Sequence, residues 1–264
     1  MVNHLIEEQL KKRILIIDGA MGTMLQRENL TAEDFGGEAL EGCNENLVLT
    51  RPDVLTNIHR AYLESGADII CTNTFGGTPL VLNEYGLGYK AEEINKRAVQ
   101  LAKQAVLEFS TDEWPRFVAG AIGPTTKTLS VTGGISFDEL LDNFYVQAKA
   151  LVEAGADLLL LETSQDMLNV KAATLGVKRA FEETGKTLPI MVSATIEPMG
   201  TTLAGQTIEA FYISIEHIKP LSIGLNCATG PEFMTDHIRS LSELATSYVS
   251  CYPNAGLPDE EGCY

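Results

Sequence analysis

Basic residues are scarce in this sequence of 264 residues. Lys and Arg number 19 against 36 Asp and Glu, so the formal net charge is -17. The only cluster of basic residues is Lys11-Lys12-Arg13. Because a protein that binds nucleic acid needs a basic face to neutralise phosphates, the composition argues against nucleic-acid binding. An acidic surface of this kind mainly favours solubility.

Closely spaced cysteine pairs and long apolar runs are also missing. The cysteines are odd in number and form no C-x-x-C motif, which argues against a disulfide scaffold and for a reducing compartment. The first apolar run, residues 14–17, stops at Asp18 and is too short for a signal peptide or a membrane span. The sequence therefore predicts a cytoplasmic protein without a membrane partner.

Histidine is sparse, and none of the four histidines falls at a predicted strand end. They occupy helical or terminal segments: His4, His59, His217 and His237. This placement argues against an imidazole general base and against a histidine-rich metal site.

Short apolar runs alternate with helical patterns along the whole chain. Seven runs read as buried strands: 14–18, 68–71, 117–121, 157–161, 190–194, 221–225 and 248–251. The intervening helices are expected at 52–65, 90–109, 137–153, 167–183, 207–217 and 231–245. Buried strands that alternate with helices indicate a parallel sheet in an α/β protein.

We predict one domain over residues 1–264, a (β/α)8 TIM barrel. A weak internal repeat, in which residues 62–70 resemble residues 151–159, supports regular βα units. Such a barrel needs eight strands, and only a loop-like run rich in Gly, Pro and acids follows the seventh. The eighth βα unit is therefore expected to be missing from this chain, leaving two strand edges open.

The candidate site lies at the carboxyl ends of these strands, where parallel α/β proteins place their chemistry. Cys227 follows a short apolar run and precedes a Gly-Pro helix start, so the scaffold would aim its thiol into the site. Asp18 and Glu162 end two other strands and could hold an ammonium group. A polar, zwitterionic small molecule fits this set.

Each candidate also has a structural interpretation. Cys227 could simply pack, Asp18 and Asn254 could be turn residues, and a buried Glu162 needs a partner. Lys127 could form a Schiff base but lies in a Thr-rich loop beyond its strand. The remaining features are read as packing residues or turns: Cys43, Cys71, Cys251 and the Gly133-Gly134 pair.

Four motifs, in order and at compatible spacing, resemble the homocysteine-binding domain of cobalamin-dependent methionine synthase. They are Asp-Gly-Ala-Met-Gly-Thr (18–23), the Gly-Ala-Asp to Thr-Phe-Gly stretch (66–76), Gly-Leu-Asn-Cys-Ala-x-Gly (224–230) and Pro-Asn-Ala-Gly-Leu-Pro (253–258). The resemblance implies a (β/α)8 barrel that binds homocysteine and zinc. Methylcobalamin and folate would be carried by other domains of the same protein or by a partner.

The resemblance also implies roles for individual residues. Cys227 matches one of three zinc-binding cysteines, while the Gly-Gly-Cys-Cys-Gly motif that supplies the other two is absent from this sequence. Asp18, with Gly19 beside it, and Glu162 match positions at the homocysteine amino group, and Thr74 matches a threonine lining that site. Asn254 matches an asparagine beside the metal, a possible exchangeable ligand. In this chemistry zinc deprotonates the bound thiol, whose sulfur then attacks the methyl group.

Three other functions stay open at this point. The chain could be a homocysteine methyltransferase with another methyl donor, such as betaine or S-methylmethionine, or a module fused to a folate reductase. It could be a barrel hydrolase or lyase driven by Asp18 and Glu162, whose activity would survive chelators and Cys227→Ser. It could also be a truncated, inactive barrel that binds an amino acid without metal.

Overall fold

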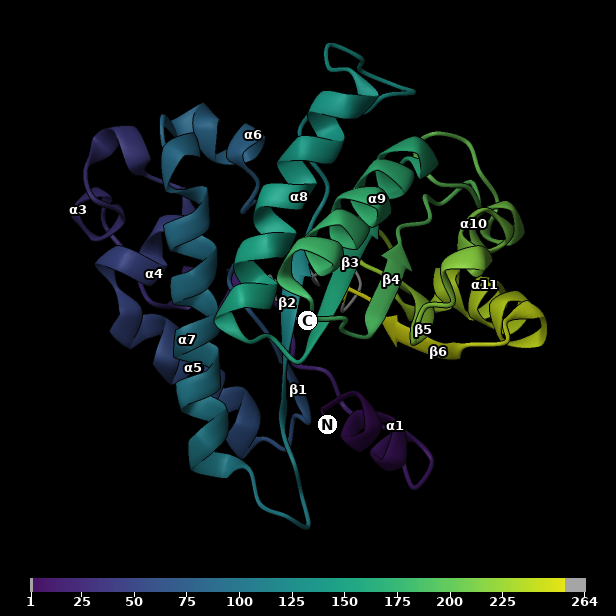
Figure 1. The fold of residues 1–264 in the computed structure, drawn as a ribbon, viewed down its shortest axis with the longest axis horizontal. Coiled ribbons are helices and arrows are strands. Elements are labelled where there is room, and N and C mark those ends of the chain that lie inside the picture. The colour runs from purple at the N-terminus through teal and green to yellow at the C-terminus, as the bar shows by residue number, and fades with distance from the viewer. Residues whose placement is uncertain (1, 255–264) are drawn as a thin grey trace, which may run out of the picture.

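One parallel sheet with helices around it forms the centre of the molecule (Figure 1). The computed structural model describes residues 2–254. Within that part of the chain, six strands pair in sequence order: β1 (Ile69–Cys71), β2 (Phe117–Ile122), β3 (Leu158–Ser164), β4 (Ile190–Ala194), β5 (Ser222–Asn226) and β6 (Tyr248–Tyr252). Every pairing is parallel. The α/β class and the parallel order are therefore as predicted, in a curled sheet that forms part of a barrel.

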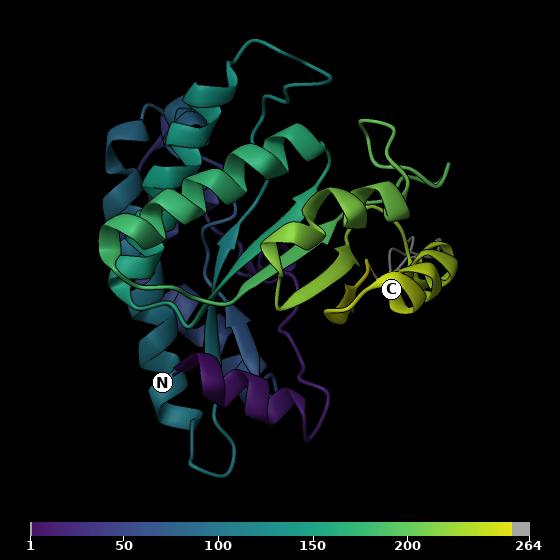
Figure 2. The same cartoon turned by 45° about the vertical axis from the view of Figure 1, so that its right-hand side comes forward.

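Helices cover the outer face of the curled sheet, as the two ribbon views show (Figures 1 and 2). The longer ones are α5 (Pro52–Glu64), α7 (Ala91–Phe109), α8 (Phe137–Ala154), α9 (Met167–Thr184), α10 (Ile208–Ile215) and α11 (Pro231–Leu244). All six lie where the sequence predicts a helix. A capping box forms at the start of α8, because Ser136 and Glu139 satisfy each other's backbone N–H groups.

Two apolar layers lie on the two faces of the sheet. On the outer face, side chains such as Leu159, Leu161 and Ile223 pack against Phe144 and Phe211 of the helices. On the inner face, a smaller cluster gathers the residues of opposite phase: Ile69, Phe117, Ala119, Leu158, Leu160 and Met191. Helix α1 (Val2–Leu10) adds its fully buried Ile6 to this inner cluster. The alternation follows from the two-residue period of a strand.

The prediction of a first strand at residues 14–18 is wrong in its extent. Only one bridge forms there, between Ile17 and Ile69, together with a hydrogen bond from the Asp18 N–H to the Ile69 carbonyl. Ile14 is 84% exposed and Ile16 55% exposed. An apolar run becomes a full strand only when neighbours use its backbone groups, and among the described residues this segment has a neighbour on one side only. The sheet thus has six strands in residues 2–254, not seven.

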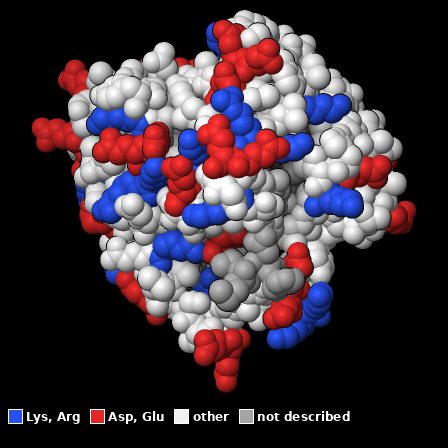
Figure 3. All heavy atoms as spheres, in the orientation of Figure 1, with Lys and Arg blue, Asp and Glu red and all other residues white. Residues whose placement is uncertain are grey.

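Short helices between Asp18 and β1 extend one end of the molecule. They comprise α2 (Met21–Arg27), α3 (Ala32–Phe35) and α4 (Leu47–Thr50), and their apolar side chains pack on α5 and α7. On the face seen in Figure 3, acidic and basic side chains are intermixed rather than sorted into a basic field. No helix within residues 2–254 is both long and apolar enough to cross a membrane.

Candidate functional site

Asp18 lies buried where the chain leaves the sheet at its carboxyl edge. Its Oδ2 accepts a hydrogen bond from the Cys71 N–H at 2.8 Å. Burial raises the pKa of Asp18 to about 7, and the hydrogen bond from Cys71 opposes this rise. Tyr62 supports the turn that follows, because its hydroxyl donates to the Ala20 carbonyl and its ring lies against Gly19.

Glu162 belongs to the same electrostatic site. It is near the end of β3, and burial, followed by the charge of Asp18, raises its pKa to about 8. The Cys71 thiol is influenced by both acids. Burial, and then the charges of Asp18 and Glu162, raise its pKa well above the usual value. Two carboxylates that resist ionisation together form a site for a cation such as an ammonium group.

Thr74 is fully buried in the loop after β1. Its hydroxyl donates to the Ala121 carbonyl at 2.7 Å and lies 2.6 Å from the Thr72 hydroxyl. Gln147 of α8 donates to the Thr74 carbonyl at 2.7 Å. The loop is therefore held by its own hydrogen bonds, and Thr74 supports the wall of the site from behind.

Cys227 follows β5 and faces β3. Its Sγ lies 3.1 Å from Asn226 Nδ2 and 3.8 Å from Thr163 Oγ1, and both groups donate to it. A sulfur that carries charge or binds a metal is stabilised by such donors. The thiol predicted from the sequence is thus placed at the same edge of the sheet as Glu162, which immediately precedes Thr163.

Backbone strain is concentrated at this edge. Thr163, Cys227 and Ala228 have φ values of 56°, 56° and 55°, in the left-handed region that non-glycine residues seldom occupy. The β3–β4 register also shifts between Leu161 and Ser164. Strain of this kind persists where surrounding contacts over-determine the backbone, typically at functional sites.

Tyr252 is a site residue that the sequence analysis missed. It lies on β6 opposite Asn226, and its ring packs with the inner cluster beside Cys71. Burial raises the pKa of its hydroxyl, as do the nearby Glu162, Cys71 and Cys227. Ser193 is close enough to influence the hydroxyl, which makes no hydrogen bond of good geometry within residues 2–254. The sequence contained one signal for Tyr252: counting in steps of two from Tyr248 places Tyr252 on the same face of the strand.

The metal site predicted from the family resemblance is not assembled in the described residues. Residues 2–254 contain no group of three or more His, Cys, Asp or Glu side chains that could hold a metal ion. Cys227 provides one thiol with suitable donors around it, and Asn254 is exposed. Zinc prefers four ligands, so these residues do not form its site alone. Cys263 and most of the Pro253–Pro258 motif lie outside the described residues.

The other candidate residues have structural roles. Lys127 is exposed, and its ammonium group donates to the Gly134 carbonyl at 2.9 Å, so nothing places it as a Schiff-base lysine. Cys43 is fully buried, which agrees with its interpretation as a packing residue. Cys251 is exposed. Of these three cysteines, only Cys71 lies in the candidate site. The four cysteines within residues 2–254 are all free.

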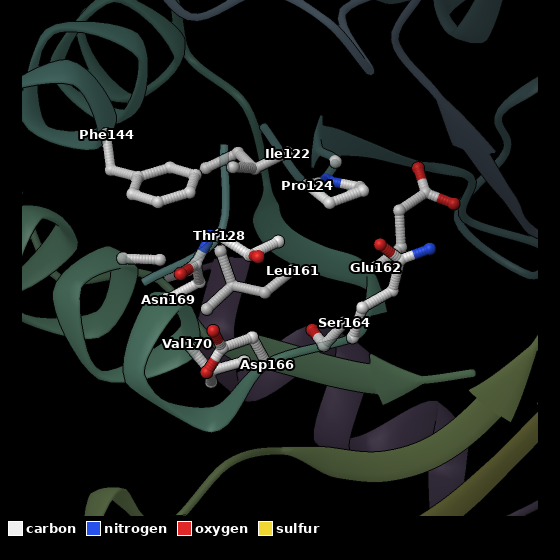
Figure 4. A pocket seen from close by; sticks show the side chains of 13 residues that line it. Ile122, Pro124, Thr128, Phe144, Leu161, Glu162, Ser164, Asp166, Asn169 and Val170 are labelled. Carbon is white, nitrogen blue, oxygen red and sulfur yellow. The ribbon is translucent and has the colours of Figure 1, made fainter. Parts of the chain in front are cut away.

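A small cavity lies behind Glu162, between β2, β3 and the start of α9 (Figure 4). Its volume is about 20 Å³, enough for about one water molecule. Asp166 closes one side, where its carboxylate accepts from the Ser130 N–H and hydroxyl and caps α9. This cavity is too small for an amino acid.

Comparison with known proteins identifies a family and a fold. Residues 15–264 match the family model described as homocysteine S-methyltransferase. Among solved structures, the chain resembles the homocysteine methyltransferase MmuM from Escherichia coli in its metallated form. The TM-score is 0.78 at 21% identity, covering 94% of this chain and 86% of that chain.

Two further forms of that protein also match. The oxidized form has a TM-score of 0.77 at 22% identity, covering 94% of this chain and 85% of that one. The apo form has a TM-score of 0.71 at 20% identity, with 92% and 83% covered. At these identities the likeness concerns the fold, whereas the family match covers nearly the whole chain.

Proposed function

The chain belongs to the homocysteine S-methyltransferase family, and we propose that it transfers a methyl group to the thiol of homocysteine, giving methionine. One observation carries this proposal. Two carboxylates with raised pKa values, the buried Asp18 and the half-buried Glu162, share the edge of the sheet with the Cys227 thiol. A ligand with an ammonium group at one end and sulfur at the other matches that arrangement.

In the proposed complex, Asp18 and Glu162 hold the homocysteine ammonium group. Its positive charge would offset the repulsion between them and allow both to ionise. Gly19, beside Asp18, is proposed to face the substrate through its backbone, and Tyr62 packs where a Cβ on Gly19 would lie. Thr74 holds the neighbouring loop in place. The substrate sulfur would then point toward Cys227.

We propose zinc as the cofactor, with Cys227 as one ligand and Asn254 as an exchangeable one. The two hydrogen-bond donors at Cys227 Sγ support this role. The remaining thiolates would have to come from outside the described residues, so no catalytic step is assigned to the metal here. The competing proposal is a barrel that binds the amino acid without metal.

The methyl donor is proposed to be methylcobalamin, presented by a separate domain or partner, as in a methionine synthase of the cytoplasm. The four sequence motifs support this choice over betaine and S-methylmethionine. The test is to incubate the full chain with homocysteine, zinc and each donor in turn, and to measure methionine. Methionine formed from methylcobalamin alone supports the proposal, and methionine formed only from S-methylmethionine or betaine refutes this donor.

The six strands are proposed to be consecutive members of a (β/α)8 barrel that residues 1–264 form in part, without its eighth strand. A cavity of about 580 Å³ supports this view, because residues 14–17 line it together with β6, whose outer edge pairs with no other strand among residues 2–254. Exposed Ile14 and Ile16 line it on one side, and Ser250 and Tyr252 on the other. A further strand between these edges would bury the apolar side chains and pair both backbones.

A carboxylate-driven hydrolase or lyase is the second candidate. The raised pKa values of Asp18 and Glu162 favour it, because an acid that titrates near neutral pH suits general acid–base catalysis. Its activity would persist in Cys227→Ser and in the presence of a chelator. Loss of homocysteine methylation in Cys227→Ser, with folding intact, would exclude it.

A further inference from the structure

Asn226 has every hydrogen-bonding position of its side chain in use. The residue is fully buried at the end of β5. Its Oδ1 accepts from the Thr163 N–H at 2.9 Å and from the Ser193 hydroxyl at 2.6 Å. Its Nδ2 donates to Thr163 Oγ1 at 2.7 Å and to Cys227 Sγ at 3.1 Å. One amide thereby connects the carboxyl ends of β3, β4 and β5.

Two of these partners are the strained residues of the site. Thr163 is β-branched and lies in the left-handed region, where such a side chain is unfavourable. Cys227 has the same unfavourable φ. Asn226 binds the backbone and hydroxyl of Thr163 and the sulfur of Cys227. It is therefore the common contact that holds the two strained residues facing each other.

The hydrogen bonds of Asn226 connect two residues of the candidate site, because of what lies next to them in the sequence. Glu162 immediately precedes Thr163, and Cys227 immediately follows Asn226. From this juxtaposition we infer that Asn226 is a positioning residue: it fixes the spacing between the carboxylate end of the site and its thiol end. This inference rests on the proposed function, because that spacing must match the length of homocysteine.

A fixed spacing makes the site selective for chain length. Cysteine has the same ammonium and thiol groups as homocysteine but is one methylene shorter. A fitted site discriminates by roughly 10–200-fold for one methylene. When Asn226 is replaced, β3 and β5 can move relative to each other, and the selectivity falls.

The test compares the full chain with Asn226→Ala and with the matched control Ser193→Ala. Ser193→Ala removes the hydroxyl that donates to Asn226 Oδ1 and leaves the links to Thr163 and Cys227 intact. Two quantities are measured: hydrogen exchange in a peptide containing the Thr163 N–H, and the ratio of homocysteine to cysteine affinity by calorimetry. For Asn226→Ala we expect exchange at Thr163 at least about tenfold faster and an affinity ratio near one. For Ser193→Ala both stay as in the parent chain.

The outcomes separate this inference from the proposed function. A folded Asn226→Ala chain that keeps the affinity ratio or the protection at Thr163 overturns the positioning role. A parent chain that binds neither amino acid refutes the proposed function, and exchange at Thr163 alone then decides whether Asn226 fixes the strand ends. If Asn226→Ala does not fold, isosteric Thr163→Val removes the hydroxyl link and is expected to lower the ratio. An unchanged ratio in folded Thr163→Val also contradicts the inference, and Thr163→Ser should restore the ratio.

Discussion

Burial, and after it the charge of Asp18, raises the pKa of Glu162. The two acids are far apart in sequence, and each ends an extended segment on the same edge. Burial raises both pKa values into the neutral range, to about 7 for Asp18 and about 8 for Glu162. The site therefore retains protons at neutral pH that a bound ammonium group would displace.

Homocysteine affinity is expected to rise between pH 6 and pH 8. At pH 6 both carboxylates are largely protonated and cannot pair with an ammonium group. As they ionise, affinity increases by up to about tenfold per pH unit for each proton displaced. Calorimetry in two buffers of different ionisation enthalpy measures that proton release. Asp18→Asn should flatten the pH dependence, and an affinity independent of pH in the parent chain would place the amino group elsewhere.

Glu162→Gln is expected to stabilise the fold at pH 8. The native carboxyl keeps its proton up to about pH 8, whereas an unfolded glutamate loses it near pH 4.5. The native state thus binds more protons between these values, and stability falls as pH rises through that window. Removing the group should raise the free energy of unfolding by roughly 2–4 kcal/mol at pH 8 and hardly change it near pH 4.

Urea unfolding at the two pH values measures the Glu162→Gln effect. Exposed Glu182→Gln serves as the control, since its side chain is 67% accessible and its nearest cation lies 4.0 Å away. A stabilisation of equal size at both pH values would show that the ionisation of Glu162 is not its cause.

Gly224→Ala is expected to destabilise the sheet. A Cβ at Gly224 would lie 2.1 Å from the Ser250 carbonyl oxygen, so β5 and β6 would have to separate. The expected loss in the free energy of unfolding is about 3 kcal/mol. Gly22→Ala is the matched control, because nothing lies within 4 Å of its added Cβ and the residue is in helix α2. It should be neutral or stabilising by up to about 1 kcal/mol. Equal effects in denaturant unfolding would contradict the close approach at Gly224.

Zinc binding by residues 1–264 is expected to be weak. Among residues 2–254, Cys227 and Asn254 offer one thiol and one amide oxygen, which fall short of the four ligands that zinc prefers. Metal analysis after desalting should find less than one zinc per chain, and Cys227→Ser should lower that amount further. Cys251→Ser, at an exposed cysteine on β6, should have no effect. One tightly held zinc that survives Cys227→Ser would exclude Cys227 as a ligand.

The sequence predicted the βα alternation, the six helices that follow in the order α5, α7, α8, α9, α10 and α11, and the carboxyl edge as the place of the site. It failed at residues 14–18 because an apolar run shows that a segment can be buried, not that it has partners on both sides. Ile14 and Ile16 are exposed for that reason.

The site was predicted less completely than the fold. Asp18, Glu162 and Cys227 were found because charged and thiol groups stand out at strand ends. Tyr252 and Cys71 were missed because their side chains are on the inner face of short strands, and in the sequence such residues look like ordinary packing residues. The strain at Thr163 and its link to Asn226 depend on how β3 meets β5, which no local pattern records.

The order β1 to β6 has a consequence for how the protein is made. Each strand pairs with the one synthesised just before it, so the sheet can grow in step with translation. Asp18 and Glu162 are in place once β3 has joined, but Asn226 arrives only with β5. A nascent chain therefore has the carboxylate end of the proposed site before its thiol end, and a ligand that contacts both ends can stabilise only the late stages of folding.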